Sequence, residues 1–464
     1  MSDSPEDKAG YILERCADCD ECRSMMTDVC PFFRELYRLF DEKQEKSPES
    51  KDLRRMVDLC NFCALCPCPE IRNGILDAKS SFIERDKMSP ALKIIQNVEK
   101  WAGKMAGAPM LANLVLQGKV TSNLVKKAAG MHPDRDIPRI PRLDLDAWTR
   151  KQGITAASSG DSPGVALFAG CSARFFFPET GMAAAGVLQK NKVNVYYPEQ
   201  NCCGMPVMLE GDRKLTLKMM EHNLENLTKI LDAGHEIVCS CPTCGYMFRE
   251  LLREKAYYSR EYQEAAGADD AYILIPKDNR APPMDQREHK GLLRMIYGSI
   301  FKDDGLFSVF PAMQRIRLAE SVSDMGEYLL RLYKNGGLSA DLAPVHKKAA
   351  YFPPCHLRKQ GIGSPYMEIL RLIPGLEIQE IKGSNLCCGM AGIMGFKQDF
   401  HHYSLEMGRP LMHKIQDMQP DILLCDCLSC RLQFRHSLSV SLAHPLEVLH
   451  ESYRQFEDSP ALNQ

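Results

Sequence analysis

The sequence predicts an α/β fold in which two copies of a parallel-sheet unit follow a mainly helical N-terminal domain. Three observations support this prediction. Two sets of five cysteines recur at a nearly constant offset, short apolar runs alternate with helical patterns in both copies, and eight further cysteines precede Pro90. An internal repeat predicts two structural units of the same topology, so it is considered before local patterns. We expect four segments: 1–90, 91–160, 161–345 with an insert near 267–315, and 346–464.

Composition limits the class of protein. The chain has 464 residues, 45% of them hydrophobic and 25% charged, which is ordinary for a soluble protein of two or three domains. Its net charge of −2 gives no reason to expect nucleic acid as a partner. The first residues carry no secretory pattern, and the apolar run Ala106–Leu116 is far shorter than the ~20 residues that span a bilayer. The twenty cysteines therefore indicate metal binding in the cytoplasm rather than disulfides.

The eight N-terminal cysteines form two runs that each begin C-x2-C-x2-C. Such a run holds three corners of a 4Fe-4S cube, and a remote cysteine followed by proline supplies the fourth ligand. Cys30-Pro31 and Cys68-Pro69 both qualify. In two-cluster ferredoxins the fourth cysteine of one run serves the other cluster. The pattern therefore predicts a ferredoxin-like domain with two crossed ligand sets: Cys16, Cys19, Cys22 and Cys68, and Cys60, Cys63, Cys66 and Cys30.

The spacing of these runs is unusual. Seven residues precede the fourth cysteine in the first run and one in the second, where three are usual. The crossed pairing is thus less strongly indicated than the clusters themselves. Zinc is the alternative, because it also binds C-x2-C pairs. The third cysteine of each run and the proline after the fourth favour iron–sulfur.

Residues 91–131 show a helical pattern that Pro109 interrupts. Its apolar residues recur at three- and four-residue spacing, and lysines lie nearby. The amphipathic part, Ala91–Leu116, either packs against the cluster domains, which we prefer, or lies on a membrane surface. The prolines after residue 131 and the Ser/Gly-rich stretch 156–164 indicate a connector.

Each later half contains three short apolar strand patterns separated by helical segments, which predicts α/β units on a parallel sheet. The cysteines follow the predicted strands, at the edge where open α/β sheets place their ligands. The region between the halves, roughly 267–315, has little pattern. The predicted strands are 165–168, 193–197, 236–239, 349–352, 376–381 and 422–424.

The two sets of five cysteines lie in register, with offsets of 184 to 186 residues. Each set contains an adjacent pair followed by glycine. Adjacent Cα atoms are about 3.8 Å apart, less than the roughly 4.4–6.8 Å of an ordinary disulfide, so such pairs are better suited to holding metal. The glycine lets the backbone approach closely. The sets are Cys171, Cys202, Cys203, Cys241 and Cys244, and Cys355, Cys387, Cys388, Cys427 and Cys430.

These motifs, two copies of Cys…Cys-Cys-Gly…Cys-x-x-Cys behind a two-cluster segment, resemble the CCG-domain iron–sulfur electron-transfer family. That family includes catalytic subunits of heterodisulfide reductase and the C subunit of anaerobic glycerol-3-phosphate dehydrogenase. The likeness is sharpest around 354–356, 387–392 and 426–433. The C subunit lacks a complete first cysteine set, whereas both sets are complete here, as in the heterodisulfide type. The N-terminal spacings and the insert fit neither relative.

The resemblance implies electron relay between a flavoprotein dehydrogenase, or another redox subunit, and menaquinone or a membrane-bound partner. It implies two cubane 4Fe-4S clusters in the N-terminal domain and one or two noncubane clusters in the CCG domains. We find no G-x-G-x-x-G after a strand and no P-loop, so we expect no flavin or NAD in this chain. A peripheral place at the inner face of the membrane stays open.

Two alternatives to a relay remain at this point. One is an enzyme of the heterodisulfide reductase type, which cleaves a thiol-coenzyme disulfide at a noncubane cluster. The other is a zinc-bearing structural or redox-sensing protein. Whether the chain is itself an enzyme is therefore undecided.

Three further residues need an interpretation. His356, beside Cys355, is a candidate catalytic proton donor to a thiolate, although a structural hydrogen-bonding role is more frequent for such a histidine. Cys239 and Cys425 each stand two residues before a C-x-x-C. We favour buried thiols for both over spare ligands.

Overall fold

The structure is a computed structural model that describes residues 4–43, 47–63, 66, 68–156, 162–278, 284–383 and 385–458. The N-terminal part is helical, as predicted. Two of its helices begin at the proline that follows a remote cysteine, so that Cys30 and Cys68 occupy the N-cap positions. Proline suits the first helical turn because its missing N–H would be unpaired there in any case. These helices are α1 (Pro5–Cys19), α2 (Glu21–Met26), α3 (Pro31–Glu42), α4 (Ser50–Asp58) and α5 (Pro69–Asp86).

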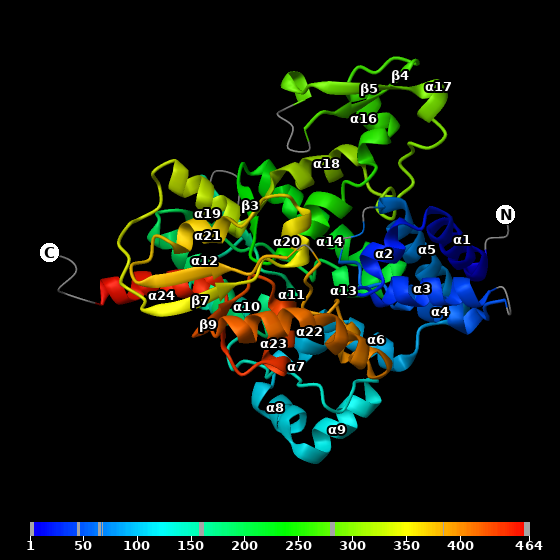
Figure 1. The fold of residues 1–464 in the computed structure, drawn as a ribbon. Coiled ribbons are helices and arrows are strands. Elements are labelled where there is room, and N and C mark those ends of the chain that lie inside the picture. Colours follow the sequence, from blue (N-terminus) through cyan, green and yellow to red (C-terminus); the bar gives the residue numbers. More distant parts are fainter. Residues whose placement is uncertain are drawn as a thin grey trace.

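The segment 91–131 forms four short helices, of which two pack against the rest of the molecule and two project from it. Ile95 and Ala102 are buried against the lobes described below, which confirms packing for the first two. The next two form a hairpin that projects from the body (Figure 1). Pro109 begins the third helix, so the predicted break lies there. The elements are α6 (Pro90–Gln96), α7 (Val98–Ala106), α8 (Pro109–Gln117), α9 (Lys119–Ala128) and, after the prolines, α10 (Leu145–Lys151).

The first lobe is a four-stranded parallel sheet in the order β2-β1-β3-β6. Its strands are β1 (Gly164–Phe168), β2 (Asn194–Tyr196), β3 (Glu236–Cys239) and β6 (Val322–Asp324). Helices connect them, and a π-helical turn, η1 (Met247–Leu251), follows α15. The helices are α11 (Gly170–Phe175), α12 (Pro178–Lys190), α13 (Met205–Leu209), α14 (Arg213–Asp232), α15 (Pro242–Tyr246), α16 (Arg260–Ala265), α18 (Ala312–Ser321) and α19 (Met325–Lys334).

The second lobe repeats this topology as β8-β7-β9-β10, again all parallel. The equivalent strands occupy equivalent places, which confirms the internal repeat and the predicted α/β class. The strands are β7 (Lys347–Tyr351), β8 (Leu376–Glu380), β9 (Ile422–Leu424) and β10 (Ser441–Ala443). The helices are α20 (Cys355–Lys359), α21 (Pro365–Leu370), α22 (His401–Met418), α23 (Leu428–Ser437) and α24 (Pro445–Glu457).

The two lobes share one hydrophobic core. Alternate residues of β1, such as Val165 and Leu167, enter it from the first lobe, and Ala349 and Tyr351 of β7 enter it from the second. The opposite faces of the same strands enter separate cores that contain the cysteines. This alternation is the period of two expected of a strand buried on both faces. Each cysteine set therefore belongs to the separate core of its own lobe, but lies close to the boundary between the lobes.

The region that showed little pattern contains an antiparallel hairpin of β4 (Tyr272–Pro276) and β5 (His289–Leu293), followed by α17 (Arg294–Tyr297). This arm stands away from the lobes in Figure 1. Residues 279–283 of the insert and 157–161 of the predicted connector lie outside the described residues. Among the helices that the structure describes, none has the length and apolar character needed to cross a bilayer.

Candidate metal centres

The first N-terminal run lies where α1 ends and α2 begins. Asp20 adopts a left-handed conformation with φ of 55° and reverses the chain between Cys19 and Cys22. A cavity of about 490 Å³ opens here, and its lining includes five cysteine side chains. Burial, followed by the neighbouring thiols, raises the pKa of Cys16 to about 12. The lining cysteines are Cys16, Cys19, Cys22, Cys66 and Cys68.

The second run lies in the irregular segment after α4. Burial is the largest cause of the raised pKa of Cys30, and the thiols of Cys60 and Cys66 raise it further. Cys66 also interacts with Cys22 and so lies between the two groups. Cys63 is near Cys355 of the second lobe. Cys68 lies with the first run and Cys30 near the second, whereas Cys66 also lines the cavity of the first run, so which sulfur binds which cluster stays a prediction.

The first-lobe set gathers at the carboxyl ends of β1, β2 and β3, as expected for an open parallel sheet. The Sγ atoms of Cys171 and Cys202 are 3.3 Å apart. Cys203 is hydrogen-bonded to Cys202 and Cys244, and these contacts lower its pKa to about 6. A Cβ at Gly170, where φ is +67°, would lie 2.7 Å from the Cys244 sulfur. The site therefore needs glycine at this position.

The second-lobe set has the same construction. Hydrogen bonds from the thiols of Cys355 and Cys388 lower the pKa of Cys387. The backbone N–H groups of Gly389 and Met390 point at the sulfurs of Cys387 and Cys388, at 3.4 and 3.5 Å. N–H donors aimed at sulfur stabilise a thiolate, which is the form that binds metal.

The two sets meet at the boundary between the lobes, which sequence reasoning did not foresee. The thiol of Cys241 in the first set interacts with that of Cys427 in the second, and its contacts with Cys244 and Cys427 lower its pKa. Thr243 Oγ1 lies 3.7 Å from the Cys427 sulfur. Interactions between neighbouring thiols consequently link all ten cysteines, in the order Cys171, Cys202, Cys203, Cys244, Cys241, Cys427, Cys430, Cys388, Cys387 and Cys355.

His356 joins three parts of the molecule. Its Nε2 lies 3.1 Å from the carbonyl oxygen of Phe62, and its Nδ1 lies 3.0 Å from Thr243 Oγ1. A carbonyl only accepts, so Nε2 donates and Nδ1 accepts from the hydroxyl. Burial lowers the pKa of His356, which keeps the imidazole neutral. The structure thus gives His356 a connecting role, while its role as a proton donor stays a prediction.

The two leftover cysteines are both buried, Cys239 fully and Cys425 to 99%. Cys239 packs in the core of the first lobe. Cys425 differs, because its sulfur reaches the carbonyl oxygen of Cys427 at 3.7 Å and its thiol raises the pKa of Cys430.

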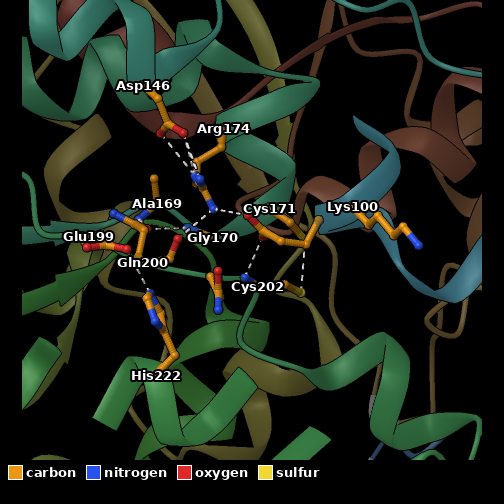
Figure 2. Close-up of polar contacts among 12 residues, drawn as sticks. Lys100, Asp146, Ala169, Gly170, Cys171, Arg174, Glu199, Gln200, Cys202 and His222 are labelled. Atoms are coloured by element: carbon orange, nitrogen blue, oxygen red, sulfur yellow. Dashed lines mark hydrogen bonds and ion pairs between the residues drawn. The ribbon is translucent and has the colours of Figure 1, made fainter. Parts of the chain in front are cut away.

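A charged network surrounds the first set (Figure 2). Arg174 of α11 donates to Asp146 and to Glu99, each at 2.7 Å. The backbone N–H of Cys202 donates to the other oxygen of Glu99, also at 2.7 Å. Gln200 accepts from the backbone N–H groups of Ala169 and Gly170, and so fixes the turn that carries Cys171 (Figure 2). Sequence reasoning missed Glu99, which lies in a helix with no feature that marks it.

Arg135 provides a test of whether these sites suit an anionic cluster. It is 1% exposed, and its hydrogen bonds go to three uncharged groups: Gly395 O, Ser404 Oγ and Gln433 Oε1. Its Nη1 is buried without a partner among the described residues. A buried cation is costly unless negative charge lies nearby, and Cys388 with its bound metal would add to the negative charge of Asp136. The residues present therefore fit an iron–sulfur cluster.

The donor chemistry agrees with this fit. All twenty cysteines are free thiols, and eighteen belong to the predicted ligand sets. Iron–sulfur clusters are held by cysteine thiolates. No group of three or more histidine, cysteine, aspartate or glutamate side chains closes around a single metal ion within the described parts of the chain.

Comparison with known proteins agrees with the repeat. The cysteine-rich domain family, CCG, matches residues 165–249 and again 349–435. The chain is 25% identical over 341 residues to the C subunit of the anaerobic glycerol-3-phosphate dehydrogenase from Escherichia coli K12, covering 73% of this chain and 71% of that one.

Two further relatives show similar identity. The B subunit of the fumarate reductase (CoM/CoB) from Methanothermobacter marburgensis is 24% identical over 306 residues, 64% of this chain and 48% of that protein. Lactate utilization protein A of Shouchella clausii is 24% identical over 294 residues, 61% of this chain and 98% of that protein. The chain therefore carries two CCG cysteine-rich domains, one in each α/β lobe, and is similar to subunits of redox enzymes.

Proposed function

We propose that this chain is an iron–sulfur electron-transfer subunit that relays electrons between a flavoprotein dehydrogenase and a quinone or other acceptor. The observation that supports the proposal is a continuous series of neighbouring cysteine side chains across the molecule. Cys63 of the N-terminal domain lies near Cys355, and from Cys355 thiol contacts run through both lobes to Cys171. When bound, iron–sulfur clusters supply one-electron steps at potentials set by charge, hydrogen bonds and solvent.

The protein's own residues prepare these sites in three ways. They exclude water, since nine of the ten lobe cysteines are buried and only Cys355 is partly exposed. They aim backbone N–H groups at sulfur, as in the loop of Gly389 and Met390. They also fix the N-terminal domain against the lobes: Lys79, 4% exposed, donates to the carbonyl oxygens of Cys60 and Leu209 at 3.0 Å each.

The cysteines that would hold the clusters are the predicted ones. The N-terminal pair of clusters would use the two crossed sets, and each lobe would hold one further cluster on its set of five. Cys239 packs in the core of the first lobe and Cys425 touches Cys430, and neither is assigned as a ligand.

A reductase of the heterodisulfide type is the second candidate, and one observation favours it. Both five-cysteine sets are complete and touch each other through Cys241 and Cys427. Two one-electron sites side by side suit the cleavage of a disulfide, which takes two electrons. The oxidised protein mixed with a thiol distinguishes the candidates: a new EPR signal from a thiol-bound cluster supports the reductase, and an unchanged spectrum supports the relay.

The α8–α9 hairpin supports a peripheral place on a membrane. Six of its large apolar side chains are more than 40% exposed: Met110, Leu111, Leu114, Val115, Val120 and Leu124. From Lys100 to Ala128 the chain carries five lysines and no acidic residue. Exposed apolar residues among lysines favour the surface of an anionic bilayer. This surface would bring the chain close to a membrane-dissolved acceptor.

Anaerobic purification with iron, sulfide and zinc analysis tests the proposal. Four 4Fe-4S clusters would give roughly sixteen irons and as many acid-labile sulfides per chain. One or two zincs without labile sulfide would refute it and support the structural zinc alternative.

A further inference from the structure

The two cysteine sets are equivalent in the repeat but lie in opposite electrostatic surroundings. Two of the charges responsible come from the segment between the N-terminal domain and the first lobe, which is outside the repeat. Glu99 of α7 reaches the first set, and Arg135, seven residues after α9, reaches the second.

At the first set the nearby charge is negative. Glu99 accepts from the backbone N–H of Cys202 at 2.7 Å and is close enough to raise the pKa of Cys171. Arg174 is the neighbouring cation, but Glu99 and Asp146 both bind it, so the three side chains carry one net negative charge. Lys100 points away from the cysteine pair in Figure 2, with its Nζ over the Trp101 ring.

At the second set the nearby charge is positive. Burial lowers the pKa of Arg135 to about 10, with Cys388 and the carboxylate of Asp136 opposing the shift, so the guanidinium is still charged at neutral pH. No carboxylate accepts a hydrogen bond from Arg135 among the described residues. Arg358 adds a second cation, which lowers the pKa of Cys387 and donates to the carbonyl oxygen of Leu386.

The charges between the lobes do not remove this difference. Asp324 ends β6 beside Cys239, and Asp426 lies between Cys425 and Cys427. The two carboxyl groups interact, and burial raises the pKa of both. They lie at the boundary that both sets share, so they act on both.

We infer that Glu99 and Arg135 give the two lobe sites different reduction potentials, with the second-lobe site the easier to reduce. This inference rests on the proposed presence of a cluster in each lobe. Reduction adds negative charge, which a nearby cation stabilises and a nearby anion opposes in a medium of low dielectric. Neither residue is a ligand, and both act through their charge.

The asymmetry assigns an order to the relay. Cys63 lies near Cys355, so electrons from the N-terminal domain reach the second-lobe site first. That site holds an electron more stably, and the first-lobe site fills afterwards. A half-reduced protein would therefore carry its unpaired electron in the second lobe.

The test is an EPR-monitored potentiometric titration of the anaerobically purified full chain, in the wild type and in charge variants. We expect two separate midpoints for the lobe sites. Glu99→Gln, which keeps the oxygen that accepts from Cys202, should raise only the lower midpoint. Arg135→Gln should lower only the higher one. Each shift should reach a tenfold change in the oxidised-to-reduced ratio at fixed potential, ~59 mV for one electron.

Two further variants serve as controls. Arg135→Lys keeps the charge and should restore the higher midpoint, and Arg253→Gln removes another buried arginine, 7% exposed, that binds Glu250 instead. If Arg135→Gln does not fold, Glu99→Gln alone decides. Iron-loaded lobes with coincident midpoints, or midpoints that the variants leave in place, would overturn the charge inference only. Lobes without iron would overturn it together with the proposed function.

Discussion

The twin glycines after the cysteine pairs allow the sharpest test of how the sites are built. Gly204 and Gly389 occupy equivalent positions and have nearly the same φ, +90° and +86°. Alanine in a left-handed conformation costs roughly 1–2 kcal/mol at either position. The surroundings differ, however. The nearest atoms to a Cβ at Gly204 are 3.8 Å away, whereas a Cβ at Gly389 would collide with the Ser404 carbonyl oxygen and lie 3.0 Å from Gly408 N.

Both of those neighbours are backbone atoms of α22, which cannot move aside as a flexible side chain could. Overpacking of this kind adds about 1–3 kcal/mol. We therefore expect Gly389→Ala to lower the free energy of unfolding by about 2–5 kcal/mol and Gly204→Ala by about 1–2 kcal/mol. Urea unfolding followed by circular dichroism, under anaerobic conditions, measures the difference. Equal losses from the two substitutions would refute the argument that α22 closes on the second pair, because the backbone strain is common to both.

Three other predictions follow from the described contacts. Leu114→Glu on α8 should abolish binding to anionic vesicles in a flotation assay while leaving cluster content unchanged, and binding that persists would contradict the membrane role of the hairpin. His444 is fully buried, and burial lowers its pKa to about 4. The free energy of unfolding should therefore fall by roughly 1.4 kcal/mol per pH unit as pH drops from about 6.5 to about 4. Acid unfolding of the His444→Gln variant should lack this contribution to the slope. Cys430→Ala should lose iron from the second lobe whereas Cys425→Ala should keep it, and equal loss in an iron assay would make Cys425 a ligand.

The strands and the cysteine sets could be predicted because their signals are local or periodic. The strand patterns at 236–239 and 422–424 correspond to β3 and β9 residue for residue. The offset between the cysteine sets predicted two lobes of one topology, and the two sheets have equivalent strand orders. β6 and β10 were missed because their segments, Val322–Asp324 and Ser441–Ala443, lack the apolar run that marked the other strands. β4 and β5 were missed although Tyr272–Pro276 contains an apolar run.

What could not be predicted depends on contacts between distant segments. The meeting of Cys241 with Cys427 requires the relative placement of two lobes, which no spacing encodes. In the sequence, nothing distinguishes Glu99 and Arg135 from the many other charged residues. Their effect arises because α7 and the chain after α9 pack against different lobes, so that each charge reaches a different cysteine pair.

The common core of the lobes makes this molecule the covalent counterpart of a symmetric dimer. Each half turns alternate side chains of its first strand towards the other half, and α12 packs on α24 across the same boundary. A half expressed alone would present that face to water and would pair with itself or precipitate. Joining the halves in one polypeptide removes that freedom, and it also permits what two identical protomers could not have: a different neighbour for each of two matching sites.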